Sequence, residues 1–358
     1  MKLKSSLISC LAFLCLLTQL AFSNPVVYEG KEGIGKGKHI VFVASDHEYR
    51  SEESLPALAR ILAKHHGYKC TVLFGVDENG HIGAGVSNIP HLNLLEQADL
   101  MVMFTRFLDL PDDQMQHIVN YIDRAGPVVG FRTSSHAFNI KNKSAKFYKY
   151  HFRYDGADYK GGFGEQILGN TWEGHYGRNH SQMTLTEIIP EQKGHVILTG
   201  VADKSYAYAG GYNGILREGM TALTTTQPLK EFHSGSPIDE SKPKVISTWV
   251  RHYKGKNGNK ARVFHSTQGA SEDLLDENYR RMSINGILWA LGQESSIKAD
   301  LNVSFVGPFN PLPYNNQGHA SNVKPSDLEG FTSAIMPSGK GHEPKSPGAP
   351  KRKKAITK

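Results

Sequence analysis

An apolar strand runs directly into a polar turn between Pro127 and Phe138, and no other stretch constrains the fold as strongly. The strand is the unbroken apolar run PVVGF at 127–131, which is typical of a strand that a parallel sheet buries on both faces. The turn is RTSSH at 132–136, where every side chain is polar. A strand that ends in such a turn predicts a corner at the carboxyl edge of a parallel sheet, where open α/β folds bind ligands.

The residues of this corner limit the chemistry that it could support. It has no cysteine and lacks the flanking glycines of the G-x-S-x-G nucleophile elbow. Thr133, Ser134 and Ser135 could simply cap a following helix, because hydroxyl oxygens accept hydrogen bonds from its first N–H groups. Arg132 and His136 go beyond what capping requires. We therefore predict a ligand-facing corner, with the three hydroxyl residues as substrate-binding candidates and Arg132 and His136 as catalytic candidates.

The first residues have the pattern of a secretory signal peptide. Lys2 and Lys4 precede the apolar run 7–22, and a small-x-small cleavage pattern ends at Ser23. Sixteen apolar residues fall short of the roughly 20 that a membrane-spanning helix needs. We expect an exported protein, periplasmic or extracellular, with no transmembrane segment after cleavage. Cys70 is the single cysteine of the mature chain, and its apolar surroundings predict a buried residue and no disulfide.

The net charge of +7 is concentrated at the two ends of the chain. Lys2 and Lys4 supply two charges and residues 338–358 supply a net six, which leaves one net negative charge on the body. This balance argues against a nucleic-acid surface. The tail is rich in Pro, Ser, Gly and Lys, a composition that predicts disorder.

Apolar runs and helical spacing predict alternating strands and helices over the first half of the chain. The predicted strands are 39–44, 70–74, 98–104 and 127–131, and the predicted helices are 55–66 and 111–124. This alternation predicts an α/β fold with a mostly parallel sheet and helices on both faces. Farther along we expect strands at 184–189, 196–199, 222–225, 245–253 and 261–267, and one helix at 271–292 with Leu275 and Gly286 on its apolar face.

This pattern predicts one domain of ordinary size. The predicted boundaries are 1–23 for the signal peptide, 24–37 for a linker, 38–295 for the α/β domain, 296–330 for an extension packed on it and 331–358 for the disordered tail.

A second polar loop, Asp46-His47-Glu48-Tyr49, directly follows the first predicted strand. Because parallel strands end at the same edge of a sheet, this loop and the RTSSH corner should share one mouth. His47 and Glu48 are candidate acid/base groups, and Asp46 and Tyr49 are candidate substrate-binding residues. For Asp46 the alternative is an Asx turn or a capping turn before the first helix.

The irregular segment 139–184 contains a further cluster of aromatic, acidic and imidazole side chains. Long irregular segments in compact domains are often functional, and aromatic faces beside polar groups suit sugar rings. The candidates are His175 as a catalytic residue and Trp172, Glu173, Tyr176 and His180 as substrate-binding residues, with Gln268 as a weaker addition near a later strand end. No metal motif is present, so the cofactor is left open, a divalent metal included.

Four segments together resemble the trehalose-utilisation (ThuA-like) family, especially its exported members from planctomycete-type bacteria. They are SDHEYR, GFRTSSHAF, LGNTWEGHYGRNH and VFHSTQGASEDLLDENYRRMSINGILWALG, supported by VGPFNPLPYNNQG and KPSDLEG near the end. The resemblance spans about 38–330. It implies a class I glutamine amidotransferase-like (flavodoxin-like) fold and a role in carbohydrate catabolism, with oxidised (3-keto) sugars among the substrates. Many family members have a histidine where this chain has Arg132, and the missing elbow cysteine excludes glutaminase chemistry.

The leading hypothesis is an exported enzyme that acts on a glycoside or a 3-keto-sugar by acid/base chemistry. His136 or His175 would carry the proton, Arg132 would hold an oxyanion or carboxylate, and His47 and Glu48 would complete the pocket. Two alternatives stay open: a non-catalytic carbohydrate-binding protein, and a metal-dependent hydrolase that uses His47, His175 and His180. In each case the expected partner is a small-molecule carbohydrate, and the sequence does not predict the oligomeric state.

Overall fold

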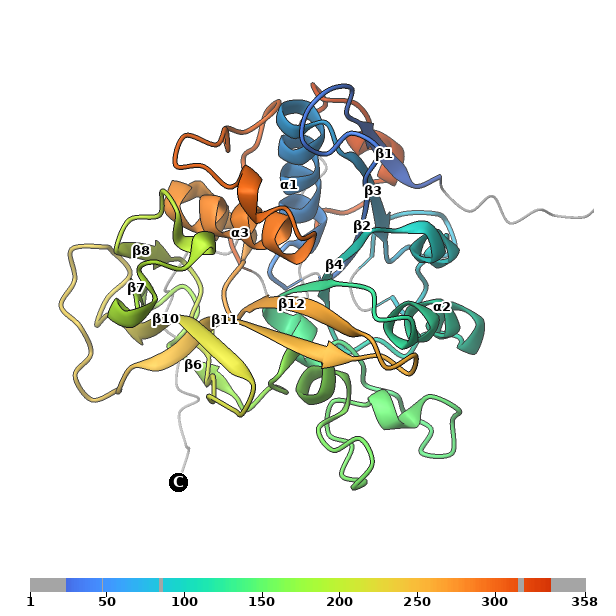
Figure 1. The fold of residues 1–358 in the computed structure, drawn as a ribbon, viewed down its shortest axis with the longest axis horizontal. Coiled ribbons are helices and arrows are strands. Elements are labelled where there is room, and N and C mark those ends of the chain that lie inside the picture. The colour runs from blue at the N-terminus through green and yellow to red at the C-terminus, as the bar shows by residue number, and fades with distance from the viewer. Residues whose placement is uncertain (1–23, 47, 84–85, 315–318, 336–358) are drawn as a thin grey trace, which may run out of the picture.

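A large mixed sheet organises the chain, as Figure 1 shows for the computed structural model, which describes residues 24–46, 48–83, 86–314 and 319–335. Among these residues, ten strands follow the order β1-β3-β2-β4-β5-β12-β11-β10-β7-β8. The parallel block consists of β2 (His39–Ser45), β3 (Lys69–Phe74), β4 (Leu100–Thr105), β5 (Val128–Phe131) and β12 (Lys260–Ser266). The antiparallel strands are β1 (Val26–Glu29) on one side, and β11 (Val245–Lys254), β10 (Met220–Pro228), β7 (Thr184–Ile188) and β8 (Lys204–Ala207) on the other.

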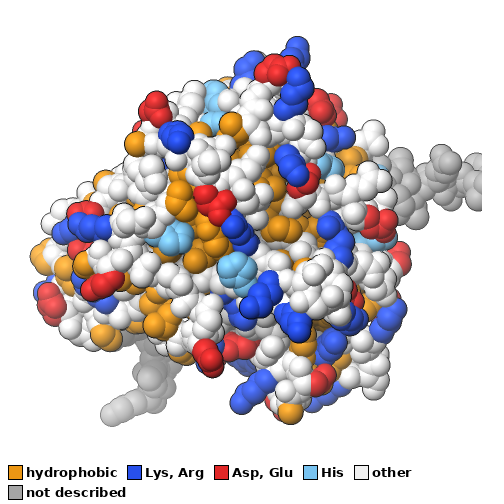
Figure 2. Space-filling model, in the orientation of Figure 1, with side chains coloured by type: hydrophobic (Ala, Val, Ile, Leu, Met, Phe, Trp, Pro, Cys, Tyr) orange, Lys and Arg blue, Asp and Glu red, His pale blue; other side chains and the backbone are white. Residues whose placement is uncertain are grey.

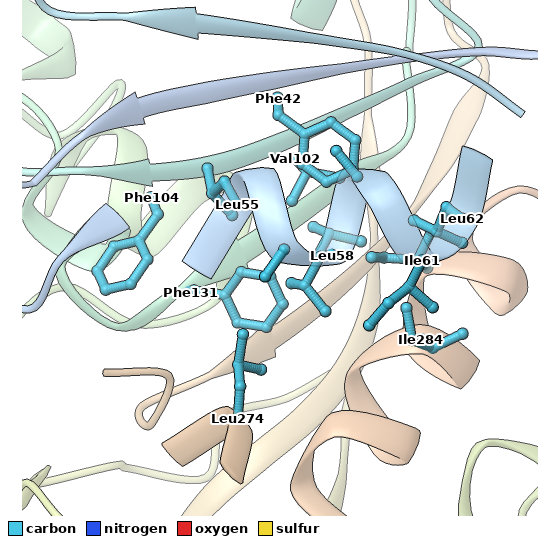
Figure 3. Packing of buried hydrophobic residues seen from close by; sticks show 14 of the residues in the cluster. Phe42, Leu55, Leu58, Ile61, Leu62, Val102, Phe104, Phe131, Leu274 and Ile284 are labelled. Carbon is cyan, nitrogen blue, oxygen red and sulfur yellow. The ribbon is translucent and has the colours of Figure 1, made fainter. Parts of the chain in front are cut away.

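Helices cover both faces of the parallel block, which confirms the predicted α/β class. Alternate residues of β2 point to opposite faces, so Phe42 joins one apolar core and Val43 the other. Helices α1 (Ser51–His66) and α3 (Glu277–Ala290) pack on the first face, and α2 (Asp112–Asp123) packs on the second. Figure 3 shows Ile61 of α1 lying toward Ile284 of α3.

Several predicted elements are wrong in type or extent. The predicted linker contains β1, which pairs with β3, and the strand predicted at 196–199 is a 3-10 turn, η6 (Val196–Leu198). The helix predicted at 271–292 is two helices, η7 (Ser271–Leu275) and α3. Asp276 separates them because its carboxylate accepts the N–H groups of Asn278 and Tyr279 and so begins a new helix. Leu275, predicted to be on the apolar face, is 46% exposed at this break.

Gly286 lies on the apolar face of α3, as predicted, at the point where α3 approaches β12 closely. A Cβ at Gly286 would lie 2.6 Å from the ring of Phe264, closer than two carbon atoms can pack.

The C-terminal extension is held to the domain by buried arginine side chains that donate to its backbone. Arg60 of α1 donates to the carbonyl oxygens of Leu328 (3.0 Å) and Ser333 (2.7 Å), and Arg280 of α3 donates to that of Val303 (2.7 Å). Residues 331–335 were predicted to belong to the tail, yet Ser333 is fixed by this contact. The signal peptide at 1–23 and residues 336–358 of the tail lie outside the described residues.

Charges of both signs are intermixed on the face drawn in Figure 2, where apolar side chains lie between them. In the described part of the chain, no helix has both the length and the apolar character needed to cross a membrane.

Two adjacent carboxyl groups, Glu52 and Glu53, are buried at the start of α1. Glu53 accepts hydrogen bonds from the hydroxyl of Ser271 (2.7 Å) and the N–H of Leu312 (2.9 Å), while Glu52 lies 3.7 Å from the guanidinium of Arg50. Burial raises the pKa of both carboxyl groups above the ordinary value of 4.5, and the charge of Glu52 raises the pKa of Glu53 further. The folded protein therefore binds protons here more tightly than the unfolded chain does.

This pair should make the protein less stable as the pH rises above about 4.5 through neutrality, because the unfolded chain releases these protons first. Glu53→Gln keeps an acceptor for Ser271 and Leu312 and removes the charge. We expect it to raise the free energy of unfolding at pH 8 by on the order of 1 kcal/mol and to change it little at pH 5. Urea titrations at both pH values measure this. The exposed carboxyl of Glu78 provides a matched control, Glu78→Gln, and an equal effect of both substitutions would contradict the assignment.

Candidate functional site

The carboxyl ends of β2, β4, β5 and β12 meet at one edge of the sheet, because these neighbouring strands are parallel. The loop after β2 and the corner after β5 were predicted to share one mouth, and this is confirmed. The guanidinium carbon of Arg132 lies 3.7 Å from the centre of the Tyr49 ring. The loop after β4 adds Arg106 and Phe107 to the same edge.

Arg132 forms the buried centre of this edge. Its side chain is fully buried, and its backbone has a φ of +45°, a conformation that costs a residue other than glycine roughly 1–3 kcal/mol. The guanidinium donates to the carbonyl oxygens of Gly210 (2.5 Å) and Thr267 (3.2 Å) and lies over the rings of Tyr49 and Tyr212. Through these contacts the Arg132 side chain joins three loops together.

The hydroxyl groups of the corner hold its own turn, η2 (Arg132–His136). Ser134 donates to the carbonyl oxygen of Met103 (2.9 Å) and Ser135 to that of Arg132 (3.2 Å). Thr133 is fully buried beside the carboxyl of Asp46. The hydroxyl groups of Ser134 and Ser135 thus donate to carbonyl oxygens and fix the turn, and η2 has no side-chain cap hydrogen bond of the kind considered in the sequence analysis.

Asp46 and Gln268 also have structural partners. The carboxylate of Asp46 accepts the N–H groups of Glu48 (2.9 Å) and Tyr49 (2.7 Å), which forms an Asx turn before α1. The amide of Gln268 is buried and donates to the hydroxyl groups of Thr186 (2.5 Å) and Thr226 (3.3 Å), between the sheet strands.

His136 lies inside a cage of aromatic rings. Its imidazole is 4.8 Å from Phe107, 5.2 Å from Trp172 and 5.4 Å from Tyr212, measured between ring centres. Burial first, and then the positive charge of Arg106, holds the pKa of His136 well below its ordinary value. His136 is therefore neutral at physiological pH.

His175 lies at the outer rim of this cage, on the short strand β6 (His175–Tyr176), which pairs with β9 (Gly211–Tyr212). Its ring is 5.4 Å from that of Trp172 and 5.6 Å from that of Tyr212. Desolvation and the charges of Arg132 and Arg106 lower the pKa of His175 to about 4. A second neutral imidazole is thus present, and this one is exposed to solvent.

A chain of hydrogen bonds runs from the backbone of Gly210 to Nε2 of His175. The N–H of Gly210 donates to Oδ1 of Asn179 (2.9 Å), so the amide nitrogen of Asn179 must donate to the hydroxyl oxygen of Tyr49 (2.8 Å). The hydroxyl proton of Tyr49 is then available for Nε2 of His175, 3.3 Å away. When the hydroxyl of Tyr49 donates to Nε2, His175 carries its own proton on Nδ1, where it can act as a hydrogen-bond donor.

Glu48 and Arg106 form an ion pair at the same edge. Nε of Arg106 lies 2.9 Å from Oε2 of Glu48, and the hydroxyl of Tyr314 donates to Oε1 (3.2 Å). Burial raises the pKa of Glu48, while the charge of Arg106 opposes that shift. A partly buried carboxyl of this kind is suited to proton transfer.

An open cleft with a volume of about 840 Å³ adjoins the ring cage along Trp172. Its lining combines aromatic and charged side chains: Phe152, Tyr154, Trp172, Arg153, Asp155, Lys160, Glu165, Glu173 and Arg217. One wall includes a turn of π-helix, η4 (Gly164–Leu168), a distortion that is frequent at functional sites. The predicted residues Trp172 and Glu173 therefore line a cavity, and Glu173 is exposed there.

The remaining predicted residues are placed elsewhere or are not described. The hydroxyl of Tyr176 donates to the carbonyl oxygen of Pro243, and His180 pairs with Glu272 at 2.8 Å. His47 lies outside the described residues. Within the described ranges, which leave out His47, no three His, Cys, Asp or Glu side chains are grouped so as to hold a metal ion.

Four residues of the site were missed by the sequence analysis: Arg106, Asn179, Tyr212 and Tyr314. Arg106 had a usable signal, since it directly follows a predicted strand of the parallel block. Tyr212 and Tyr314 had none, because only the folded chain brings them to the edge of the sheet.

No family model matches the chain, and no curated protein matches it. Some solved structures resemble it at a distance. A ThuA-like protein from Bacteroides uniformis is 12% identical, with a TM-score of 0.45 over 77% of this chain and 100% of that one. A ThuA-like protein from Parabacteroides merdae is 15% identical, with a TM-score of 0.45 over 79% and 98% of the two chains. The N-terminal domain of mmIFT52 is 12% identical, with a TM-score of 0.38 over 71% and 97%. Likenesses of this extent assign no family, so the ThuA-like resemblance rests on the sequence motifs.

The tautomer of His175 should depend on the hydroxyl group of Tyr49. In the unaltered protein we expect a neutral ring above about pH 4, with the proton on Nδ1 and none on Nε2. Tyr49→Phe removes the donor to Nε2 and should increase the share of the other tautomer, as read from ¹⁵N NMR of the ring nitrogens. Tyr176→Phe is the control, because that hydroxyl bonds to Pro243. A ring that is charged at pH 6, or an unchanged tautomer in Tyr49→Phe, would rule out the proposed hydrogen-bond chain.

Proposed function

We propose that the protein is an exported ThuA-like enzyme that binds a small carbohydrate at the carboxyl edge of its sheet and acts on it by proton transfer. The observation that carries this proposal is the position of the neutral imidazole of His175. It lies between the ring of Trp172, which lines the cleft, and a hydrogen-bond chain that ends in Tyr49. Aromatic faces and mixed charges along a cleft suit a polyhydroxylated ligand, which needs apolar contact and many hydrogen bonds.

The order of the parallel strands supports the family resemblance. Numbered among themselves, β3, β2, β4, β5 and β12 run in the order 2-1-3-4-5, which is the flavodoxin-type order. Such sheets bind ligands where the strand order reverses, which here is between β2 and β4. Glu48 and Arg106 come from the loops after these two strands.

Two residues of the site contact the ligand, and two others hold those residues in position. Nδ1 of His175 donates to a carbonyl or glycosidic oxygen of the sugar, and the carboxylate of Glu48 accepts a proton. Arg132 and His136 are buried and act by fixing the loops and the rings. In this assignment His175, and not His136, carries the proton. Arg132, which was predicted to hold an oxyanion or carboxylate, positions the loops instead.

His175→Gln and Glu48→Gln should each lower turnover by about 100-fold or more, because a positioned acid or base commonly contributes that much. The mature protein, starting at Asn24, is mixed with trehalose or with 3-keto-trehalose, and new sugar signals are followed by NMR. His233→Gln is the matched control, since His233 is exposed and pairs with Glu231. Full activity in both site variants would overturn the assigned roles. Saturable binding without product would show a carbohydrate-binding protein instead of an enzyme.

Export can be tested separately from catalysis. In a bacterial host that carries the full chain, we expect the protein outside the cytoplasm with Asn24 as its first residue, as measured by intact-mass and N-terminal sequencing. Retention in the cytoplasm with Met1 intact would contradict the proposed localisation and would leave the catalytic proposal untouched.

A further inference from the structure

The C-terminal extension reaches the candidate site as well as covering α1 and α3. Its backbone is fixed beside the start of α1, where Leu312 donates its N–H to Glu53 (2.9 Å) and Arg50 donates to the carbonyl oxygen of Pro313 (3.3 Å). The next residue along the chain is Tyr314. The same buried groups that hold the extension therefore determine where Tyr314 is placed.

Tyr314 touches three separate parts of the site. Its hydroxyl donates to Oε1 of Glu48 (3.2 Å), and its ring centre is 5.0 Å from that of Tyr49. Its N–H lies 3.1 Å from Nε2 of His180 and 3.3 Å from Oε2 of Glu272. His180 and Glu272 thus orient the backbone of Tyr314, which gives the predicted residue His180 a role that needs no metal.

We propose that Tyr314 is a positioning residue that holds the carboxylate of Glu48 and favours its ionised form, so that the C-terminal extension is part of the active site. The catalytic consequence of this rests on the proposed function, whereas the effect on Glu48 does not.

The sign of the effect follows from the groups that face Glu48. Arg106 and Arg132 favour the ionised carboxylate, and Asp46 and burial oppose it. A hydroxyl that donates to a carboxylate stabilises the charged form, so it lowers the pKa of that carboxyl. Tyr314 therefore acts in the same direction as the ion pair with Arg106, and it acts from a different segment of the chain.

Tyr314→Phe removes only the hydroxyl and keeps the ring against Tyr49 and the backbone contacts. The side-chain carboxyl of Glu48 is followed by ¹³C NMR across a pH titration, and Glu48→Gln identifies its signal. We expect the titration midpoint to rise by roughly one to two units, as the loss of one hydrogen bond to a charged group implies. The acid limb of the pH profile of kcat/KM should move upward by the same amount.

Tyr28→Phe is the matched control because the hydroxyl of Tyr28 donates to Leu328 of the same extension (2.6 Å), far along the chain from Tyr314. It should loosen the extension without moving the midpoint of Glu48. An unchanged midpoint in Tyr314→Phe, or an equal shift in Tyr28→Phe, would overturn the inference. If the unaltered protein turns over no sugar while Tyr314→Phe still moves the midpoint, the proposed function fails and the assignment of Tyr314 stands.

Discussion

The buried guanidinium of Arg132 is the charge on which the rest of the site depends. Taking a cation out of water costs several kcal/mol unless its surroundings replace the lost hydration. Here the replacement comes from the carbonyl oxygens of Gly210 and Thr267 and from the rings of Tyr49 and Tyr212. A desolvated cation over an aromatic ring is stabilised by about 2 kcal/mol or more, so these contacts are worth forming together. The partners belong to segments far apart in the sequence. The site is consequently complete only when the loops after β2 and β12 and the ribbon β6–β9 are all in place.

The same charge explains how acid and base functions can coexist at one edge of the sheet. Together with desolvation and Arg106, it keeps His175 neutral, which leaves the imidazole free to donate from Nδ1. Burial raises the pKa of Glu48, and the charge of Arg106 and the hydroxyl of Tyr314 oppose that rise. The neutral imidazole of His175 and the hydrogen-bonded carboxyl of Glu48 therefore lie at the same edge of the sheet. Where the surroundings of two titratable groups push their pKa values apart, the two groups commonly serve as the acid and the base of a reaction.

The sequence predicted the parallel block and the corner after β5, because both depend on local patterns of apolar and polar residues. It also predicted that the loop after β2 would meet this corner, from the rule that parallel strands end at one edge. It could not predict the role of Arg132, since an arginine at a polar turn resembles a ligand-binding group until its carbonyl partners are known. Nor could it find Tyr314, whose contact with Glu48 joins residues 266 positions apart. The break at Asp276 was missed because an acidic residue near a helix start supports a continuous helix and a new N-cap equally well.

The central claim is that a carbohydrate binds where His175 and Trp172 meet, and chemical-shift mapping tests it most directly. The side-chain ring signals of the mature protein are recorded by NMR while trehalose or 3-keto-trehalose is added. The account predicts saturable chemical-shift changes at the Trp172 indole and the His175 ring. The changes at Trp289, which lies on helix α3 away from this site, should be smaller. Saturable shifts confined to other parts of the molecule, or no shift with either sugar, would contradict it.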